Sequence, residues 1–180
     1  LLRALPIPPA TLAERMQWPA VQAVLSVARL HLDAEELSQL EPGGAVILPP
    51  SLLAVWRGRL RGIDEPARAG VGLPVLLPTP LSPRFARGPA GAATTEQDAD
   101  GDRWPCEVRL GTTYTLAGNR LTGWFDEALG EVGPGASIWT CATGREPASC
   151  LATGQLMPWG DGWALALESL CEDRNLPVGA

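Results

Sequence analysis

Short apolar runs separated by Pro and Gly turn signals make up most of this chain, a pattern that predicts strands rather than long helices. Two runs are long, "AVQAVLSVARLHL" at 20–32 and "CEVRLGTTYTL" at 106–116. The shorter predicted strands lie at 45–48, 52–63, 69–77, 136–141, 148–157 and 162–170. We therefore predict a mostly β fold with short helical turns.

Turn signals separate several of these strands. The Pro-Gly pairs at 42–43 and 134–135 suit type II turns, in which Pro presets the first φ angle and Gly adopts a positive one. Each pair is expected to lead into a short strand, 45–48 or 136–141. The Asp-Gly pair at 161–162 predicts a hairpin between the last two strands.

Helical signals are brief. In "LDAEELSQL", Asp33 is a good N-cap and Glu36 follows three residues later, which is the capping-box spacing. The segment 121–129, "LTGWFDEAL", is the expected counterpart in the second part of the chain.

The same order of elements occurs twice. Each copy begins with Trp-Pro and continues through a long strand, a helical turn, a Pro-Gly turn and shorter strands. The predicted organisation is a lead-in at 1–17, a first domain at 18–77, a linker at 78–103, a second domain at 104–170 and a tail at 171–180. The linker is rich in Pro, Gly, Ala, Thr and acids, so it is expected to be mobile and cut first by proteases. Because the chain starts without Met, we expect it to be a piece of a longer protein.

Each copy is small for an independent core, and a short open sheet leaves unpaired edges. We therefore expect the two copies to pack on each other, within one chain or exchanged between chains. If so, the fragment 104–180 alone should self-associate.

The net charge of −6 arises in the second part of the chain. Residues 1–77 hold 7 Arg and 7 acids, whereas 78–180 hold 7 Arg and 13 acids. A net acidic chain is a poor nucleic-acid ligand, because phosphate neutralisation dominates that affinity. No apolar run reaches the length of about 20 residues that a membrane span needs, so direct membrane insertion is not expected.

The cysteines and the single histidine do not form a metal-binding pattern. No two of the four cysteines, Cys106, Cys141, Cys150 and Cys171, have C-x-x-C spacing, and His31 is far from all of them in sequence. We expect reduced, mostly buried thiols, as in a cytoplasmic protein.

The two copies resemble the surface-presentation-of-antigens (SpoA) domain. The resemblance lies in "VQAVLSVARLHLDAEELSQLEPGGAVIL" of the first copy and in "CLATGQLMPWGDGWALALESL" of the second. It covers about 18–77 and 104–170. In the second copy, Gln155 follows Gly154 where the family more often has an acid, and the extra residues near Trp124 depart from the pattern. A tandem pair is similar to the carboxyl-terminal part of the cytoplasmic-ring, or sorting-platform, protein of type III secretion systems, a relative of flagellar motor switch proteins.

This resemblance implies two small β units that pair as an intertwined pseudo-dimer. It implies a non-enzymatic scaffold in the cytoplasm, at the inner-membrane secretion apparatus. The implied partners are the amino-terminal segment of the stator protein that regulates the export ATPase, other copies of the chain, and a separate carboxyl-terminal SpoA product. The alternatives are a flagellar motor switch component and a small all-β binding or enzymatic domain unrelated to secretion.

Residue patterns for catalysis are weak. His31 lies between two leucines at a strand end, which is typical of a structural histidine. Asp126 and Glu127 are neighbours on an expected helical turn and do not face each other. The "GPGAS" loop is followed by no Lys and does not resemble a phosphate loop. We therefore expect no enzyme activity, no cofactor and no metal.

One strand carries the candidate partner-binding residues. In "VWRGRLRGI", the side chains of Arg57, Arg59 and Arg61 share one face, which suits an acidic segment, while Trp56 points to the other. The alternative for this face is a row of solvated arginines. Most of the 7 Trp are expected in the core or between the copies, and one or two, such as Trp56, in contact with a partner.

Overall fold

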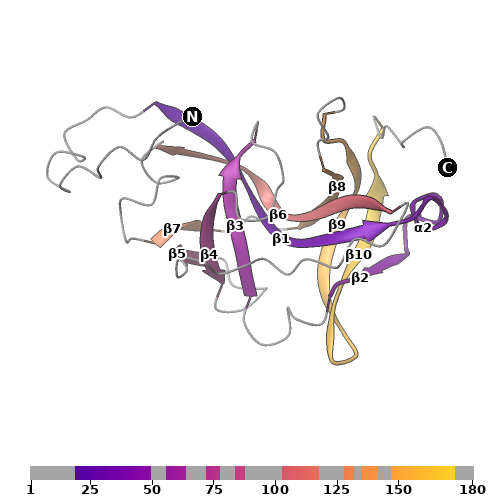
Figure 1. Ribbon diagram of the computed structural model, residues 1–180. Coiled ribbons are helices and arrows are strands. Elements are labelled where there is room, and N and C mark those ends of the chain that lie inside the picture. Colours follow the sequence, from indigo (N-terminus) through magenta and orange to yellow (C-terminus); the bar gives the residue numbers. More distant parts are fainter. Residues whose placement is uncertain are drawn as a thin grey trace, which may run out of the picture.

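The mostly β fold class is confirmed. The computed structural model describes residues 19–49, 56–63, 72–77, 84–87, 103–117, 128–131, 135–141 and 147–172. Its elements are β1 (Ala20–Leu32), α2 (Ala34–Ser38), β2 (Ala45–Ile47), β3 (Trp56–Gly62), β4 (Leu73–Leu77), β5 (Arg84–Arg87), β6 (Trp104–Ala117), β7 (Ala128–Glu131), β8 (Ala136–Thr140), β9 (Cys150–Trp159) and β10 (Gly162–Leu170). Figure 1 shows these strands in one elongated molecule.

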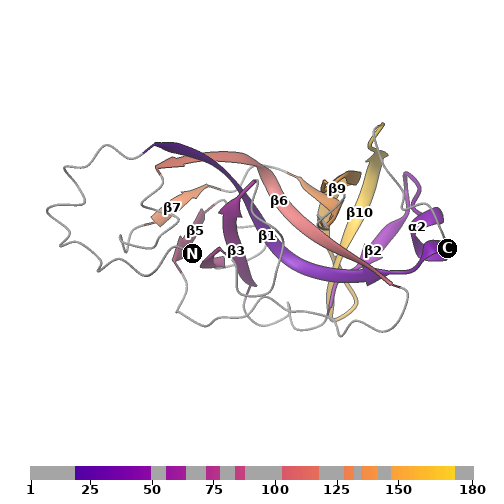
Figure 2. The same cartoon turned by 45° about the horizontal axis from the view of Figure 1, so that its top comes forward.

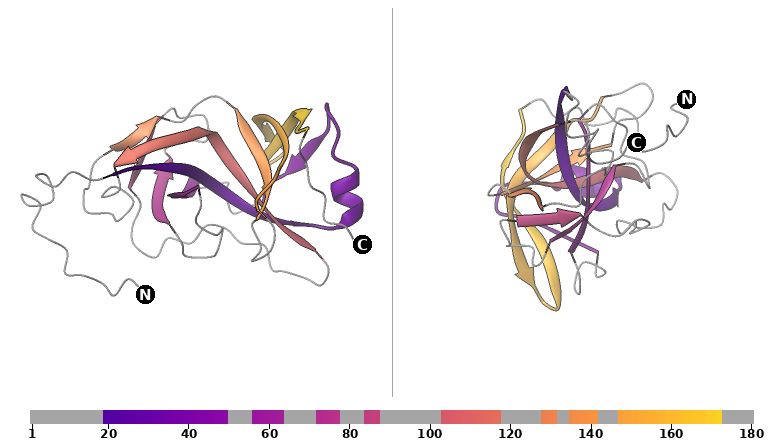
Figure 3. Two further views of the ribbon diagram at one scale, coloured as in Figure 1. Left: turned by 90° about the horizontal axis from the view of Figure 1, so that it is seen from above. Right: turned by 90° about the vertical axis from the view of Figure 1, so that its left-hand side faces the viewer.

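All ten strands belong to one sheet with the order β2-β10-β9-β8-β6-β1-β3-β4-β5-β7. The two long strands, β1 and β6, are antiparallel neighbours at its centre and pair from Ala20 with Ala117 to Leu32 with Trp104. They run side by side through the middle of the molecule (Figure 2). Seen from above, in the left view of Figure 3, they follow its long axis.

Strands of the two halves interleave in this sheet. We call β1–β5 the amino-terminal half and β6–β10 the carboxyl-terminal half. Outward from β1 come β3, β4 and β5, followed by β7 of the other half. Outward from β6 come β8, β9 and β10, followed by β2 of the other half. Each wing of the sheet therefore ends in a strand that the opposite half supplies.

The predicted turn at Pro42 and the predicted hairpin are confirmed. Gly43 has a φ of +88°, and the N–H of Gly44 donates to the carbonyl oxygen of Glu41 over 3.0 Å. In the hairpin of β9 and β10, Trp159 pairs with Gly162, so the turn residues are 160–161, one position earlier than expected. Gly160 has a φ of +55°, which suits the first central position of a type II′ turn.

The predicted capping box at the start of α2 is confirmed. The Asp33 carboxylate accepts from the N–H of Glu36 over 2.8 Å, and the Glu36 carboxylate accepts from the N–H of Asp33 over 2.9 Å. Leu37, on the next position of the helix, is buried and anchors this short turn to the core. Its expected counterpart at 121–129 lies mostly outside the described residues, and its last two residues belong to β7.

Two expectations about the organisation of the chain are corrected. Arg84–Arg87, inside the predicted linker, forms β5 and pairs with β4 and β7, while the remaining linker residues up to 102 lie outside the described part. The strands after the two Pro-Gly turns are not equivalent, since β2 is an end strand of the sheet whereas β8 lies beside β6. The counterpart of β2 in the sheet is β7, which forms the end of the other wing. The short strands 45–48 and 136–141 looked equivalent because the same turn precedes both.

The described residues contain a single apolar core cluster. It contains fully buried residues from both halves, among them Leu25 and Leu60 of the amino-terminal half and Ile138 and Leu165 of the carboxyl-terminal half. Neither half therefore encloses a core of its own. The described residues contain no helix of the length and apolar character that crossing a membrane requires.

Candidate functional site

A group of buried charged side chains lies at the centre of the sheet, across the boundary between the halves. Glu107 of β6 is 1% exposed and accepts hydrogen bonds from Arg61 of β3 and from Arg109 of its own strand. The Arg109 Nε lies 2.6 Å from Glu107 Oε1, and its guanidinium carbon lies 4.1 Å from the ring centroid of Trp139 on β8. We call Arg61, Glu107, Arg109 and Trp139 the seam cluster.

The position of β1 determines how this cluster forms. Because β1 lies between β3 and β6, the Arg61 side chain must pass over β1 to reach Glu107. On β1, Ser26 is paired with Arg59 on one side and Arg109 on the other. Paired residues of antiparallel strands share a face, and the small Ser26 leaves room there for the long side chains of its neighbours. The cluster thus connects three strands across a fourth.

Burial sets the electrostatics of the cluster. It lowers the pKa of Arg109, and the negative charge of Glu107 opposes this shift. Buried ions are tolerated when each one is paired and hydrogen-bonded, as they are here. The cluster contains no nucleophile, and one oxygen of its carboxylate is occupied by both guanidiniums. Its chemistry suits a structural connection between the halves.

The predicted partner-binding row is at the surface only in part. Arg57 is exposed. Arg59 is 9% exposed and donates to the carbonyl oxygen of Gly72 over 3.2 Å, and Arg61 is 4% exposed within the seam cluster. The expectation of three guanidiniums on an open face is therefore wrong for Arg59 and Arg61. Trp56 begins β3 and its side chain lies outside the described residues, so partner binding by Trp56 and Arg57 stays a prediction.

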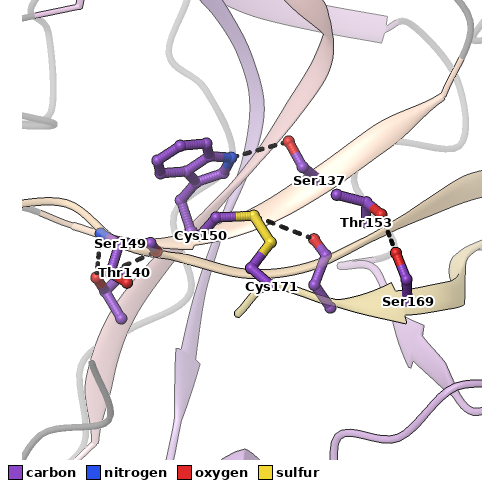
Figure 4. The surroundings of a disulfide bond; sticks show 9 residues. Ser137, Thr140, Ser149, Cys150, Thr153, Ser169 and Cys171 are labelled. Atoms are coloured by element: carbon purple, nitrogen blue, oxygen red, sulfur yellow. Dashed lines mark hydrogen bonds between the residues drawn. A yellow bond between two sulfur atoms is a disulfide. The ribbon is translucent and has the colours of Figure 1, made fainter. Parts of the chain in front are cut away.

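The expectation of four reduced cysteines is corrected. Cys150 at the start of β9 and Cys171 directly after β10 form a disulfide, with their Cα atoms 5.8 Å apart. Figure 4 shows this bond beside the hydroxyl pair of Thr153 and Ser169, whose oxygens are 2.7 Å apart. Both interactions lie on the strand pair β9–β10. The sequence spacing gave no sign of the bond, because it depends on how these two strands are paired.

The other two cysteines are buried free thiols, as expected. Burial raises the pKa of Cys106 to about 12, with smaller contributions from Cys141 and Glu107. Burial also raises the pKa of Cys141. These shifts are opposite to those of reactive cysteines, so neither thiol has the character of a nucleophile. His31 is 6% exposed at the end of β1, opposite Pro105.

The remaining sequence candidates add no site. Asp126 and Glu127 lie outside the described residues, and so do the first two residues of the "GPGAS" loop, 133–134. Gly135 of this loop is described and has a φ of +85°, as the expected turn requires. Within the ranges that the structure describes, no group of three or more His, Cys, Asp or Glu side chains is arranged to hold a metal ion.

Sequence reasoning missed the seam cluster, although one signal was present. In "CEVRL", Glu107 is a single acid between Cys106 and Val108 in an apolar strand, and such an acid needs a buried partner. Its partner Arg61 is 46 positions away, so the pair is invisible without the strand order.

A scan against models of known protein families found no match for this chain. A search of curated proteins likewise found no matching relative.

Proposed function

We propose that this chain is a tandem-SpoA scaffold of the cytoplasmic ring, or sorting platform, of a type III secretion system. The observation that carries the proposal is the interleaved strand order, in which β2 completes the wing of the carboxyl-terminal half and β7 that of the amino-terminal half. This is the arrangement expected of two SpoA units that form an intertwined pseudo-dimer within one chain. The "G-x-L" and Pro-Gly motifs that carry the resemblance lie in β9 and directly before β2.

The seam cluster and the shared core support a scaffolding role. Both connect the halves into one body, and a rigid body with two related halves can offer a partner a surface made jointly by both. In this proposal the partner is the amino-terminal segment of the stator protein that regulates the export ATPase. The chain also associates with other copies of itself or with a separate carboxyl-terminal SpoA product.

Calorimetry with the stator segment tests this function. The full chain should bind the segment of a secretion stator, whereas an equimolar mixture of segment and unfolded chain should give no heat of binding. Binding to the segment of a flagellar stator alone would favour the motor switch alternative. If neither segment binds, the scaffold function is wrong.

The disulfide makes the proposed cytoplasmic position testable as well. Disulfides persist in oxidising compartments and are kept reduced in the cytosol. A protein in the cytoplasm should therefore carry Cys150 and Cys171 as thiols, although their positions allow a bond. Thiol trapping in intact cells, followed by mass spectrometry, measures this directly. A fully oxidised pair in cells would contradict the cytoplasmic position.

A further inference from the structure

Three large apolar side chains gather on one face at one end of the sheet. Ile47 of β2 is 65% exposed, Trp159 of β9 is 51% exposed, and Met157 of β9 is 36% exposed. Ile47 and Met157 both lie opposite Ala164 of β10, one on each side. Because paired residues share a face and Trp159 is two positions beyond Met157, all three side chains point the same way. We call Ile47, Met157 and Trp159 the wing patch.

The wing patch is not part of the core. The alternate residues of the same strands point to the opposite face. Leu165 pairs with Val46 on one side and with Leu156 on the other; Val46 and Leu165 belong to the core cluster, and Leu156 packs against it. The patch is also built from both halves, since Ile47 comes from β2 and the other two from β9. The small Ala164, which is 0% exposed, lies between Ile47 and Met157, so an incoming side chain contacts the two large residues that flank it.

The described charges on the strands of the patch have one sign. The described residues 41–48 and 147–172 contain four acids, Glu41, Asp161, Glu168 and Glu172, and no Arg or Lys. All four are exposed. Asp161 lies in the hairpin turn two residues from Trp159, and the N–H of Gly43, near Glu41, donates to the carbonyl oxygen of Leu167, next to Glu168.

This charge distinguishes between the possible occupants of the patch. A second copy placed symmetrically on the same face would bring the acids nearest the patch, Asp161 and Glu168 of each copy, toward each other, and the described residues of these strands supply no cation between them; like charges across an interface are repulsive. Nucleic acid and anionic lipid would be repelled in the same way. A polypeptide segment with apolar side chains on one side and Arg or Lys beside them matches both the apolar surface and its acidic surroundings.

We propose that the wing patch binds a basic amphipathic segment of another protein. Its apolar side chains contact Ile47, Met157 and Trp159, and its cations lie toward Asp161 and Glu168. Trp159 is the expected main contributor, because a half-exposed Trp buries much apolar area on binding and keeps an N–H for a hydrogen bond. This inference does not depend on the secretion role, since it uses only the exposure, pairing and charge of these strands.

The test uses the full 180-residue chain and a dye-labelled synthetic peptide with Leu and Arg at helical spacing. Two control peptides have the same length, one with every Arg replaced by Glu and one with the original residues in scrambled order. Fluorescence anisotropy should show binding of the basic amphipathic peptide and at least about tenfold weaker binding of both controls. Equal binding of the basic and scrambled peptides would overturn the proposal.

Variants locate the binding surface. Trp159→Ser should weaken binding about tenfold or more. Ile63→Ser should not change it, because Ile63 is a comparably exposed apolar residue, 43%, at the end of β3 in the other wing. Asp161→Asn should weaken binding at low salt more than at high salt, because salt screens the exposed charges.

A second measurement does not rely on any variant being folded. With ¹³C-methyl methionine in the otherwise unchanged protein, the Met157 signal should shift in proportion to the fraction of peptide bound. Binding without a shift of this signal would place the peptide elsewhere and overturn the proposal. Preferential binding of anionic vesicles, or dimerisation lost in Trp159→Ser, would also overturn it in favour of a lipid or a second copy.

Discussion

Replacing Glu107 with Leu tests whether the seam cluster holds the two halves together. Arg61 and Arg109 bind the same carboxylate oxygen of Glu107, and both guanidiniums would stay buried after the carboxylate is removed. Removal of one partner from a buried ion pair costs about 3–5 kcal/mol, because the remaining charge is not compensated. Folded domains are stable by about 5–15 kcal/mol, so this variant should lose a large part of its free energy of unfolding.

Urea unfolding followed by Trp fluorescence measures this loss. The matched control is Glu168→Leu, an exposed strand glutamate on β10, which should change the free energy of unfolding by no more than about 0.5 kcal/mol. The triple variant Arg61→Met, Glu107→Leu, Arg109→Leu should recover most of the loss, since apolar side chains of similar volume replace buried ion groups with little cost.

Two results would refute this reasoning. The first is a loss of less than about 1 kcal/mol in Glu107→Leu, because a buried carboxylate bound by two guanidiniums cannot be removed so cheaply. The second is additivity of the losses in Arg61→Met and Glu107→Leu, since residues in contact should show a coupling energy of about 0.5–3 kcal/mol in a double-mutant cycle.

Three other positions give sharp expectations. Gly154→Ala should disrupt the β9–β10 pair, because a Cβ there would lie 1.8 Å from the carbonyl oxygen of Ala166. Gly43→Ala meets no atom within 4 Å and should cost only about 1 kcal/mol for a side chain at a φ of +88°, so an equal loss of thermal stability in both variants would contradict a steric cause. Because the pKa of Cys106 is raised from 9.0 to about 12, the folded state keeps a proton that the unfolded state loses, so stability should fall as pH rises from 9 to 12. In urea titrations at several pH values, Cys106→Ala should reduce that fall by up to about 1.4 kcal/mol per pH unit, and an unchanged slope would speak against it. Opening the disulfide by dithiothreitol or Cys150→Ala should lower the free energy of unfolding by about 3 kcal/mol, given its sequence separation of 21, and unchanged urea midpoints would rule this out.

Local features of the fold could be predicted from the sequence because their causes are local. The capping box of Asp33 and Glu36, the positive φ of Gly43 and the final hairpin each depend on residues within a few positions of one another. The strand 84–87 was missed because it has one large apolar residue, Phe85, between two Arg and Pro-rich segments, which is too little apolar surface to indicate a strand. Its order comes from pairing with β4 and β7, which the chain brings together from distant positions.

The burial of Arg59 and Arg61 could not be predicted, for a related reason. Alternating Arg57, Arg59 and Arg61 resemble a solvent-facing row in any strand that has one face open to water. Here β3 is covered on both faces from Gly58 to Gly62, so two of the three guanidiniums are buried. Whether an alternating polar row faces solvent depends on what the rest of the chain places against it, and that information is not in the strand itself.

The seam cluster also helps to determine which register the two central strands adopt. β1 and β6 present mainly apolar side chains to the core, and a shift by two residues would keep the same side chains on the same faces. Such a shift would move Glu107 by about 7 Å along β6, too far for Arg61 to follow from β3. The facing of side chains alone therefore does not distinguish these two registers, whereas the buried ion pair exists in only one of them. β3 pairs with the outer edge of β1, and β8 pairs with the outer edge of β6. The register that Glu107 selects therefore also positions both wings, including their end strands β2 and β7, each of which comes from the opposite half.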